Sequence, residues 1–114
     1  MILTAELAAE IVTRAMHIIH HNVNVISPDG IIVASGDKSR IGTVHEMGWQ
    51  AAKQRQVISI YDEDVSGSSS VDTHYAPGIN TPIIVSGEVL CVVGVSGNPH
   101  EISRYAALCR PVAH

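Results

Sequence analysis

Residues 78–97, GINTPIIVSGEVLCVVGVSG, form the stretch that most constrains the fold. Two runs rich in β-branched residues flank Ser86-Gly87, a two-residue signal for a β-hairpin. The second run, 88–95, is almost entirely apolar, and a strand of that kind is covered on both faces. We therefore predict a sheet with this strand at its centre.

The remaining apolar periodicity predicts helices and shorter strands around this hairpin. Residues 4–20 carry apolar side chains at helical spacing, with Thr4 as the N-cap. A polar loop is expected at 62–77 and a last helix at 98–110. The other predicted strands are 22–27, 31–35 and 57–61. This order describes one α+β domain over residues 1–114, a five-stranded antiparallel sheet with flanking helices, as in PAS-like sensor domains.

Residues 33–48, VASGDKSRIGTVHEMG, connect a predicted strand to the middle helix. Thr43, followed by Glu46 three positions later, matches a capping box. We therefore expect the helix to begin at Val44 and to run to about Gln56.

This predicted helix start has the chemistry of a carboxylate site. Unpaired N–H groups and the helix dipole attract anions, and Lys38, Arg40 and His45 lie close by in the sequence. Gly36 and Gly42 remove side chains that would keep a ligand from the backbone. The same residues also make up an ordinary polar turn with Arg40 as a solvated charge, so both interpretations stay open at this point.

Composition argues against several classes of function. Seven Lys and Arg scattered along a chain of net charge −4 give no basic stripe for nucleic acid, and the absence of Phe leaves little for base stacking. No apolar run approaches the roughly 18 residues of a membrane-spanning helix, and the N-terminus lacks a signal-peptide pattern. Cys91 and Cys109 belong to no paired framework. We expect a cytosolic domain that does not contact a membrane.

One histidine cluster is a candidate metal site. His17, His20 and His21 lie near the end of the first predicted helix, but no neighbouring Cys or acidic cluster completes a ligand set. Histidines at this position also interact favourably with the helix dipole. We therefore expect no metal and no cofactor.

Catalysis is not indicated by the sequence. The run 94–97, GVSG, lacks the spacing of a G-x-S-x-G elbow. Cys91 lies in an apolar strand, where a thiol stays protonated and unreactive. We expect a domain that is not an enzyme. A module that only dimerises, through its first and last helices, is the main alternative to a ligand-binding domain.

Four motifs give the chain a more specific resemblance. They are NVNVISPDG at 22–30, ASGDKSRIGTVHE at 34–46, GINTPIIVSGEVLCVVGVSG at 78–97 and RYAAL at 104–108. Together they resemble the sugar diacid recognition domain, the N-terminal sensor of the carbohydrate diacid regulators. The resemblance extends from about Leu3 to Leu108.

The resemblance implies a ligand-sensing domain at the N-terminus of a longer bacterial transcriptional regulator. In that family a C-terminal helix-turn-helix binds DNA, and these 114 residues contain no such motif. The implied ligand is a sugar diacid such as glucarate or galactarate, or the related hydroxy acid glycerate. A homodimer is expected, because such sensors act by shifting the geometry of paired helices. The identity of the acid, and the choice between activation and repression, stay open.

The implied site combines the SGD turn, the helix start and the GIN turn. Arg40 and the backbone N–H groups of residues 43–45 would hold a carboxylate. Ser35, Asp37 and Asn80 would contact hydroxyl groups, and His45 would donate to an oxygen. The expected ligand-binding residues are Ser35, Gly36, Asp37, Arg40, Ile41, Gly42, Thr43, His45, Gly78, Ile79 and Asn80.

Overall fold

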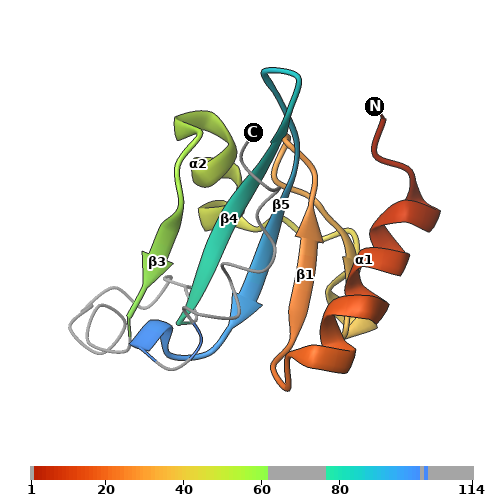
Figure 1. Ribbon diagram of the computed structural model, residues 1–114, viewed down its shortest axis with the longest axis vertical. Helices are drawn as coiled ribbons and strands as arrows, with labels where there is room; N and C mark the ends of the chain where they lie inside the picture. Colours follow the sequence, from red (N-terminus) through yellow and green to blue (C-terminus); the bar gives the residue numbers. More distant parts are fainter. Residues whose placement is uncertain (1, 62–76, 101, 103–114) are drawn as a thin grey trace.

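The computed structural model describes residues 2–61, 77–100 and 102, which contain two α-helices, one short 3-10 helix and five strands (Figure 1). Most of the expected loop and last helix lie outside the described residues. In chain order the elements are α1 (Ala5–Ile18), β1 (Val23–Ile26), β2 (Ile32–Ser35), η1 (Lys38–Arg40), α2 (Glu46–Gln54), β3 (Ile58–Ile60), β4 (Gly78–Val85) and β5 (Glu88–Ser96).

The five strands form one antiparallel sheet in the order β2-β1-β5-β4-β3. The nearly all-apolar strand β5 is at its centre, which confirms the prediction from the hairpin sequence. Ser86 and Gly87 join β4 to β5 with φ angles of 51° and 81°. Positive φ at both central residues is the geometry of a type I′ turn, whose twist matches that of the paired strands. The predicted α+β architecture is confirmed.

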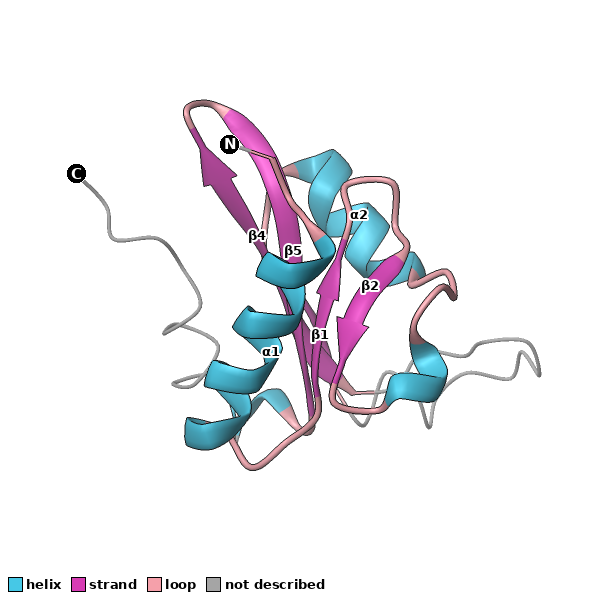
Figure 2. Cartoon of the chain, turned by 90° about the vertical axis from the view of Figure 1, so that its right-hand side faces the viewer, coloured by secondary structure: helices cyan, strands magenta, loops and turns pink. Residues whose placement is uncertain are grey.

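Helices α1 and α2 pack on opposite faces of the sheet, and Figure 2 shows the sheet between them. The larger core lies on the α1 face and includes Ala8, Val12, Ile19, Val23, Val25, Ala34, Ile79, Cys91, Val93, Val95 and Ile102. The smaller core lies on the α2 face and consists of Ile26, Ile32, Ala51, Ala52 and Val92. No helix in the described ranges is long and apolar enough to cross a lipid bilayer.

Helix α1 begins as its sequence predicts. Thr4 is the N-cap, and its Oγ1 accepts a hydrogen bond of 3.0 Å from the N–H of Leu7. The outer surface of the helix is polar and carries an ion pair of 2.8 Å between Arg14 and Glu10, one turn apart.

Helix α2 begins two residues later than expected, and the predicted capping box is wrong. The N-cap is His45, and Thr43 Oγ1 instead donates to the carbonyl oxygen of Arg40 at 2.6 Å. The cause is a bridge between residues 43–45 and the start of β2. Ile32 N–H donates to Thr43 O at 3.0 Å and His45 N–H donates to Gly30 O at 2.7 Å. This pairing keeps the chain extended until His45.

Helix α2 approaches the sheet closely at Gly48. A Cβ placed on Gly48 would lie 2.6 Å from Cδ1 of Ile26, a fully buried side chain of β1. The glycine in this helix therefore serves close packing, as its position within an otherwise regular helical pattern suggested.

Candidate functional site

A pocket of about 290 Å³ opens on the α2 face of the sheet, beside the first turn of α2. Its volume is near the lower limit of the roughly 300–1,000 Å³ typical of small-molecule sites. The lining residues come from β1, from the turn before α2, from the first turn of α2, and from β4 and β5. They are Asn24, Arg40, Thr43, Val44, His45, Glu46, Met47, Pro77, Gly78, Asn80, Gly94, Val95 and Ser96.

Arg40 supplies the positive charge of the pocket. It is the last residue of η1, whose N-cap Asp37 accepts a hydrogen bond from the N–H of Arg40 through its carbonyl oxygen at 3.0 Å. The guanidinium is half-buried and has no ion pair or side-chain hydrogen bond within the described part of the chain. A cation that lines a pocket without a counter-ion is suited to an anionic ligand.

Of the three backbone amides expected to be free, those of residues 43–45, only that of Val44 has no partner in the described structure, and two further free amides follow in α2. The N–H groups of Thr43 and His45 donate to protein carbonyl oxygens, so they are not available to a ligand. The N–H groups of Glu46 and Met47 are the first two of α2, and neither has a partner among the residues described. They place the positive end of the helix dipole at the pocket wall.

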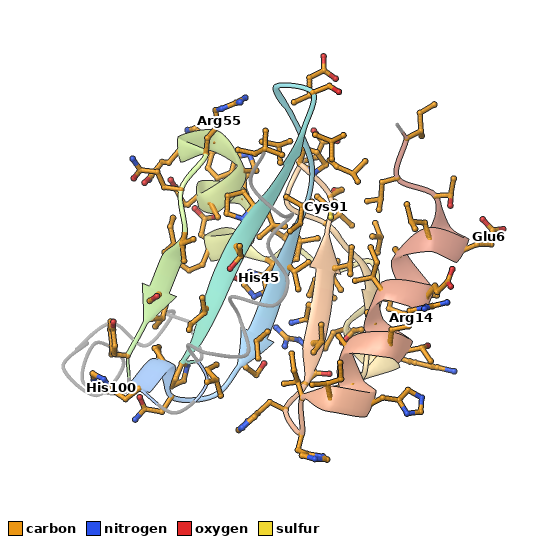
Figure 3. The ribbon with its side chains drawn as sticks, in the orientation of Figure 1. Glu6, Arg14, His45, Arg55, Cys91 and His100 are labelled. Carbon is orange, nitrogen blue, oxygen red and sulfur yellow. The ribbon has the colours of Figure 1, made fainter. Side chains whose placement is uncertain are left out.

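His45 is neutral in this arrangement and acts as the helix cap. Its Nδ1 accepts a hydrogen bond of 2.9 Å from the N–H of Gly48, which leaves the ring proton on Nε2. Burial lowers the pKa of His45, and the nearby Arg40 guanidinium lowers it further. Figure 3 shows His45 near the centre of the molecule, whereas Glu6 and Arg14 point outward from α1. The imidazole therefore offers the pocket a neutral N–H donor.

Three residues on neighbouring strands line up across the pocket floor. Gly94 of β5 pairs with Asn24 of β1 on one side and with Asn80 of β4 on the other. Directly paired residues point to the same face of a sheet, so both amides stand beside the glycine on the α2 face. Asn24 and Asn80 are 1% and 4% exposed, so these polar side chains lie in the interior of the sheet.

Each of these two amides uses one end to bond within the protein. Asn24 Oδ1 accepts from Ser35 Oγ at 2.6 Å and from Asn22 Nδ2 at 3.2 Å. Asn80 Nδ2 donates to the carbonyl oxygen of Ile58 at 3.4 Å. In the described part of the chain, Asn24 Nδ2 and Asn80 Oδ1 have no partner.

The structure brings part of the expected residue set to the pocket. The residues of that set that line it are Arg40, Thr43, His45, Gly78 and Asn80. Ser35 lies behind Asn24, and its Oγ also accepts from the N–H of Asp37 at 3.0 Å. The Asp37 carboxylate accepts from the hydroxyl and the N–H of Ser39 at 2.6 and 3.1 Å. Both hydrogen bonds lower the pKa of Asp37, and the bond from the hydroxyl has the larger effect.

The remaining expected residues have structural surroundings of their own. A Cβ on Gly36 would collide with Met16 and Asn22, so this glycine makes room for protein atoms. Ile41 is exposed, and Gly42 has a φ of +90° with open space around it. Ile79 belongs to the core on the α1 face.

Sequence reasoning missed Asn24 and Gly94. Both carried a detectable signal, because Asn24 interrupts an apolar run in NVNVI and Gly94 interrupts another in VVGVS. A polar residue and a glycine inside strands that are otherwise apolar often mark a site or a close approach. Their common location depends on strand pairing, which the sequence alone does not supply.

In the described part of the chain, His17, His20 and His21 do not form a metal-binding group. Among residues 2–61, 77–100 and 102, no three His, Cys, Asp or Glu side chains are grouped to hold an ion. The expectation of a metal-free domain stays a prediction.

Comparison with protein families then places the chain. Residues 3–114 match the sequence model of a family described as "Putative sugar diacid recognition". The chain belongs to the sugar diacid recognition family. The resemblance that the motifs suggested is thus confirmed over nearly the whole length of this domain.

Three curated relatives are similar to this sugar diacid recognition domain. An uncharacterized protein of Haemophilus influenzae is 40% identical over 106 residues, which are 93% of this chain and 28% of that protein. The Escherichia coli carbohydrate diacid regulator is 36% identical, over 93% of this chain and 26% of its own length. YsfB of Bacillus subtilis is 31% identical, over 96% of this chain and 29% of its own length. The domain therefore spans less than a third of each of these relatives.

A solved structure supports the fold of the sugar diacid recognition domain. The GAF domain of an Acinetobacter phosphoenolpyruvate-protein phosphotransferase superposes with a TM-score of 0.60 at 9% sequence identity. The match covers 82% of this chain and 66% of the other. At that identity the likeness shows a common architecture, and GAF domains are PAS-like in fold.

Proposed function

We propose that the pocket beside α2 binds a small organic acid of the sugar diacid class, with glucarate, galactarate and the hydroxy acid glycerate as candidates. The observation that carries this proposal is the Arg40 guanidinium, which lines the pocket without a protein counter-ion among the described residues. Next to it in the pocket wall are the unpaired N–H groups of Glu46 and Met47.

A carboxylate fits this combination of donors. A guanidinium can bind both oxygens of a carboxylate in a charge-assisted pair, and helix N–H groups add further donors. Neutral His45 contributes a donor through Nε2, which suits an oxygen of either a carboxylate or a hydroxyl. Glu46 also lines the pocket, and its carboxylate accepts from Gln50 Nε2 at 3.3 Å, one turn along the helix. No ion pair joins Glu46 to Arg40 among the described residues, so the guanidinium is available to a ligand.

We propose that this binding serves sensing within a longer transcriptional regulator. The name of the E. coli relative, carbohydrate diacid regulator, and its greater length support this assignment. In such a protein the domain would act as a homodimer, and a C-terminal helix-turn-helix would contact DNA. We propose that the location is cytoplasmic, as for other DNA-binding regulators.

The described site supports binding without catalysis. Ser35 Oγ donates to the amide of Asn24, and Cys91 lies in the core on the opposite face of the sheet. His45 Nδ1 is occupied by the N–H of Gly48. In the described part of the chain, neither Ser35 Oγ nor Thr43 Oγ1 is hydrogen-bonded to the imidazole of His45, the pairing that an activated nucleophile needs.

Thermal unfolding with a panel of ligands tests the proposal. Glucarate, galactarate and glycerate are compared with the uncharged polyol galactitol at matched ionic strength. A ligand that binds only the folded domain raises the free energy of unfolding by RT ln(1 + [L]/Kd), about 2.7 kcal/mol at 100 Kd. Stabilisation by an acid that grows with concentration supports the proposal. If no acid stabilises the domain while it elutes as a dimer in size-exclusion chromatography, the dimerisation module is the correct alternative.

A further inference from the structure

We propose that the row formed by Asn24, Gly94 and Asn80 reads hydroxyl groups on the carbon chain of the ligand. The pocket would thereby prefer polyhydroxylated acids over unsubstituted acids of the same length. This inference rests on the proposed function, because it concerns the same pocket. It assigns the carboxylate and the hydroxyl groups of the ligand to different walls.

The spacing of the row leaves room for ligand atoms above Gly94. Asn24 and Asn80 are on the two strands that flank β5, so their backbones are two strand spacings, about 9–10 Å, apart. A Cβ on Gly94 would lie 3.0 Å from Asn80 Oδ1 and 3.9 Å from Asn24 Cβ. Glycine is therefore the residue that keeps the space between the two amides open.

The internal hydrogen bonds determine which atom each amide offers. Asn24 Oδ1 is occupied by Ser35 and Asn22, so the available group is the Nδ2 donor. Asn80 Nδ2 is directed to the carbonyl oxygen of Ile58, so the available group is the Oδ1 acceptor. A donor and an acceptor thus flank the glycine at the pocket floor.

A hydroxyl group is the functional group that satisfies both atoms. It can accept from Asn24 Nδ2 and donate to Asn80 Oδ1, whereas a carboxylate can only accept and would face the Asn80 oxygen unfavourably. A methylene group would leave both buried atoms unpaired, and a site built to bond a hydroxyl rejects an analogue that lacks it. The carboxylate belongs at Arg40 and the α2 N-terminus, and the hydroxylated carbons belong over Gly94.

The first test compares two six-carbon diacids by calorimetry on the wild-type domain. Galactarate carries four hydroxyl groups and adipate carries none. We expect galactarate to bind about 10-fold more tightly or better, because two buried amide atoms stay unpaired with adipate. Equal affinities would overturn the inference while the proposed function stands. If neither acid binds, nor any other acid of the panel, the proposed function fails and this inference fails with it.

Variants of the row residues then test whether the row causes the preference for galactarate over adipate. Asn80→Leu keeps the branched shape but removes the Oδ1 acceptor and the Nδ2 donor, and Gly94→Ala narrows the space by one methyl group. Each should reduce the galactarate-to-adipate ratio to about 3 or less by weakening galactarate more than adipate. Thr81→Val is the matched control. Thr81 is the next residue of β4, is 1% exposed, points to the opposite face and lacks a partner for Oγ1 in the described structure.

The two variants do not depend on each other. If Asn80→Leu fails to fold, as judged by circular dichroism, Gly94→Ala still tests the row because it retains both amide side chains. A ratio that stays at the wild-type value in a folded variant would overturn the assignment. So would an equal loss of ratio in Thr81→Val.

Discussion

Nδ1 of His45 accepts a hydrogen bond of 2.9 Å from the N–H of Gly48, so a titratable side chain caps helix α2 at the wall of the pocket. The bond requires a lone pair on Nδ1 and therefore a neutral ring. Burial and the neighbouring Arg40 guanidinium both favour that neutral form. The start of α2 and the protonation of one imidazole are thus coupled.

This coupling predicts that the domain loses stability in mild acid. The pKa of His45 is lowered in the folded protein from its ordinary value of 6.5, so the unfolded chain binds a proton first as the pH falls. The free energy of unfolding then decreases as the pH drops from about 7 through 6.5 to the lowered folded pKa. Urea denaturation at a series of pH values measures this decrease.

His45→Asn is the control for the pH effect. Asparagine is among the best N-cap residues and does not titrate, so the variant should keep the cap and show a weaker dependence on pH between about 7 and 5. The two proteins differ at this one residue, so the difference between their pH profiles gives the contribution of His45. Identical pH profiles for wild type and His45→Asn would contradict the coupling.

Arg40→Ala should abolish or strongly weaken acid binding without unfolding the domain. A charge-assisted hydrogen bond contributes about 1.5–3 kcal/mol, so the loss of affinity should be roughly 10-fold to 100-fold. The Arg40 side chain has no ion pair in the described structure, so the unliganded melting temperature should change little. Calorimetry with galactarate gives the affinity. Arg14→Ala is the control: it removes an exposed arginine of α1 and should bind galactarate with the affinity of the wild type. A ligand-induced shift that survives in Arg40→Ala would place the site elsewhere.

Gly48→Ala should destabilise the domain even though alanine is the better helix former. The new methyl group would meet Ile26 Cδ1, and overpacking of a core costs about 1–3 kcal/mol against a propensity gain of about 1 kcal/mol. Ile26→Val removes that Cδ1 atom. The double variant should therefore lose less unfolding free energy than the two single variants lose together. Additive effects in denaturant unfolding would show that the close approach of α2 does not limit this position.

Ser35→Ala should destabilise the domain and also weaken the preference for hydroxylated acids. The hydroxyl donates to Asn24 Oδ1 and accepts from the N–H of Asp37 and, at 3.4 Å, from Asn22 Nδ2, so its removal leaves three groups with one partner fewer. The expected cost is about 1–3 kcal/mol, because Asn24 is buried. Calorimetry with galactarate and adipate then separates the two effects. A loss of stability with an unchanged affinity ratio would show that Ser35 does not orient the amide of Asn24.

The architecture could be predicted because its signals are local in the sequence. The Ser86-Gly87 turn, the apolar run of β5 and the Thr4 cap each lie within a few consecutive residues. The cap of α2 could not be predicted in the same way. The bridge between Ile31 and Val44 holds the chain extended and overrides the capping-box pattern of Thr43.

The candidate pocket could be predicted in part where its lining residues are continuous in the sequence, and could not be predicted where strand pairing brings them together. Arg40 and His45 lie in one polar stretch, and the structure brings both side chains to the same pocket. Asn24 and Gly94 are seventy residues apart in the sequence and meet only through the antiparallel register of β1 and β5. Nothing in the residues around either position specifies that register.

Strand β1 contributes to both sides of the sheet. Asn24 reaches the pocket, while Val23 and Val25 on either side of it are packed in the core beneath α1. These three residues are consecutive in one strand. Any displacement of the backbone at Asn24 would therefore also move the two valines in the core. One layer of β-sheet separates the pocket from α1 on the opposite face.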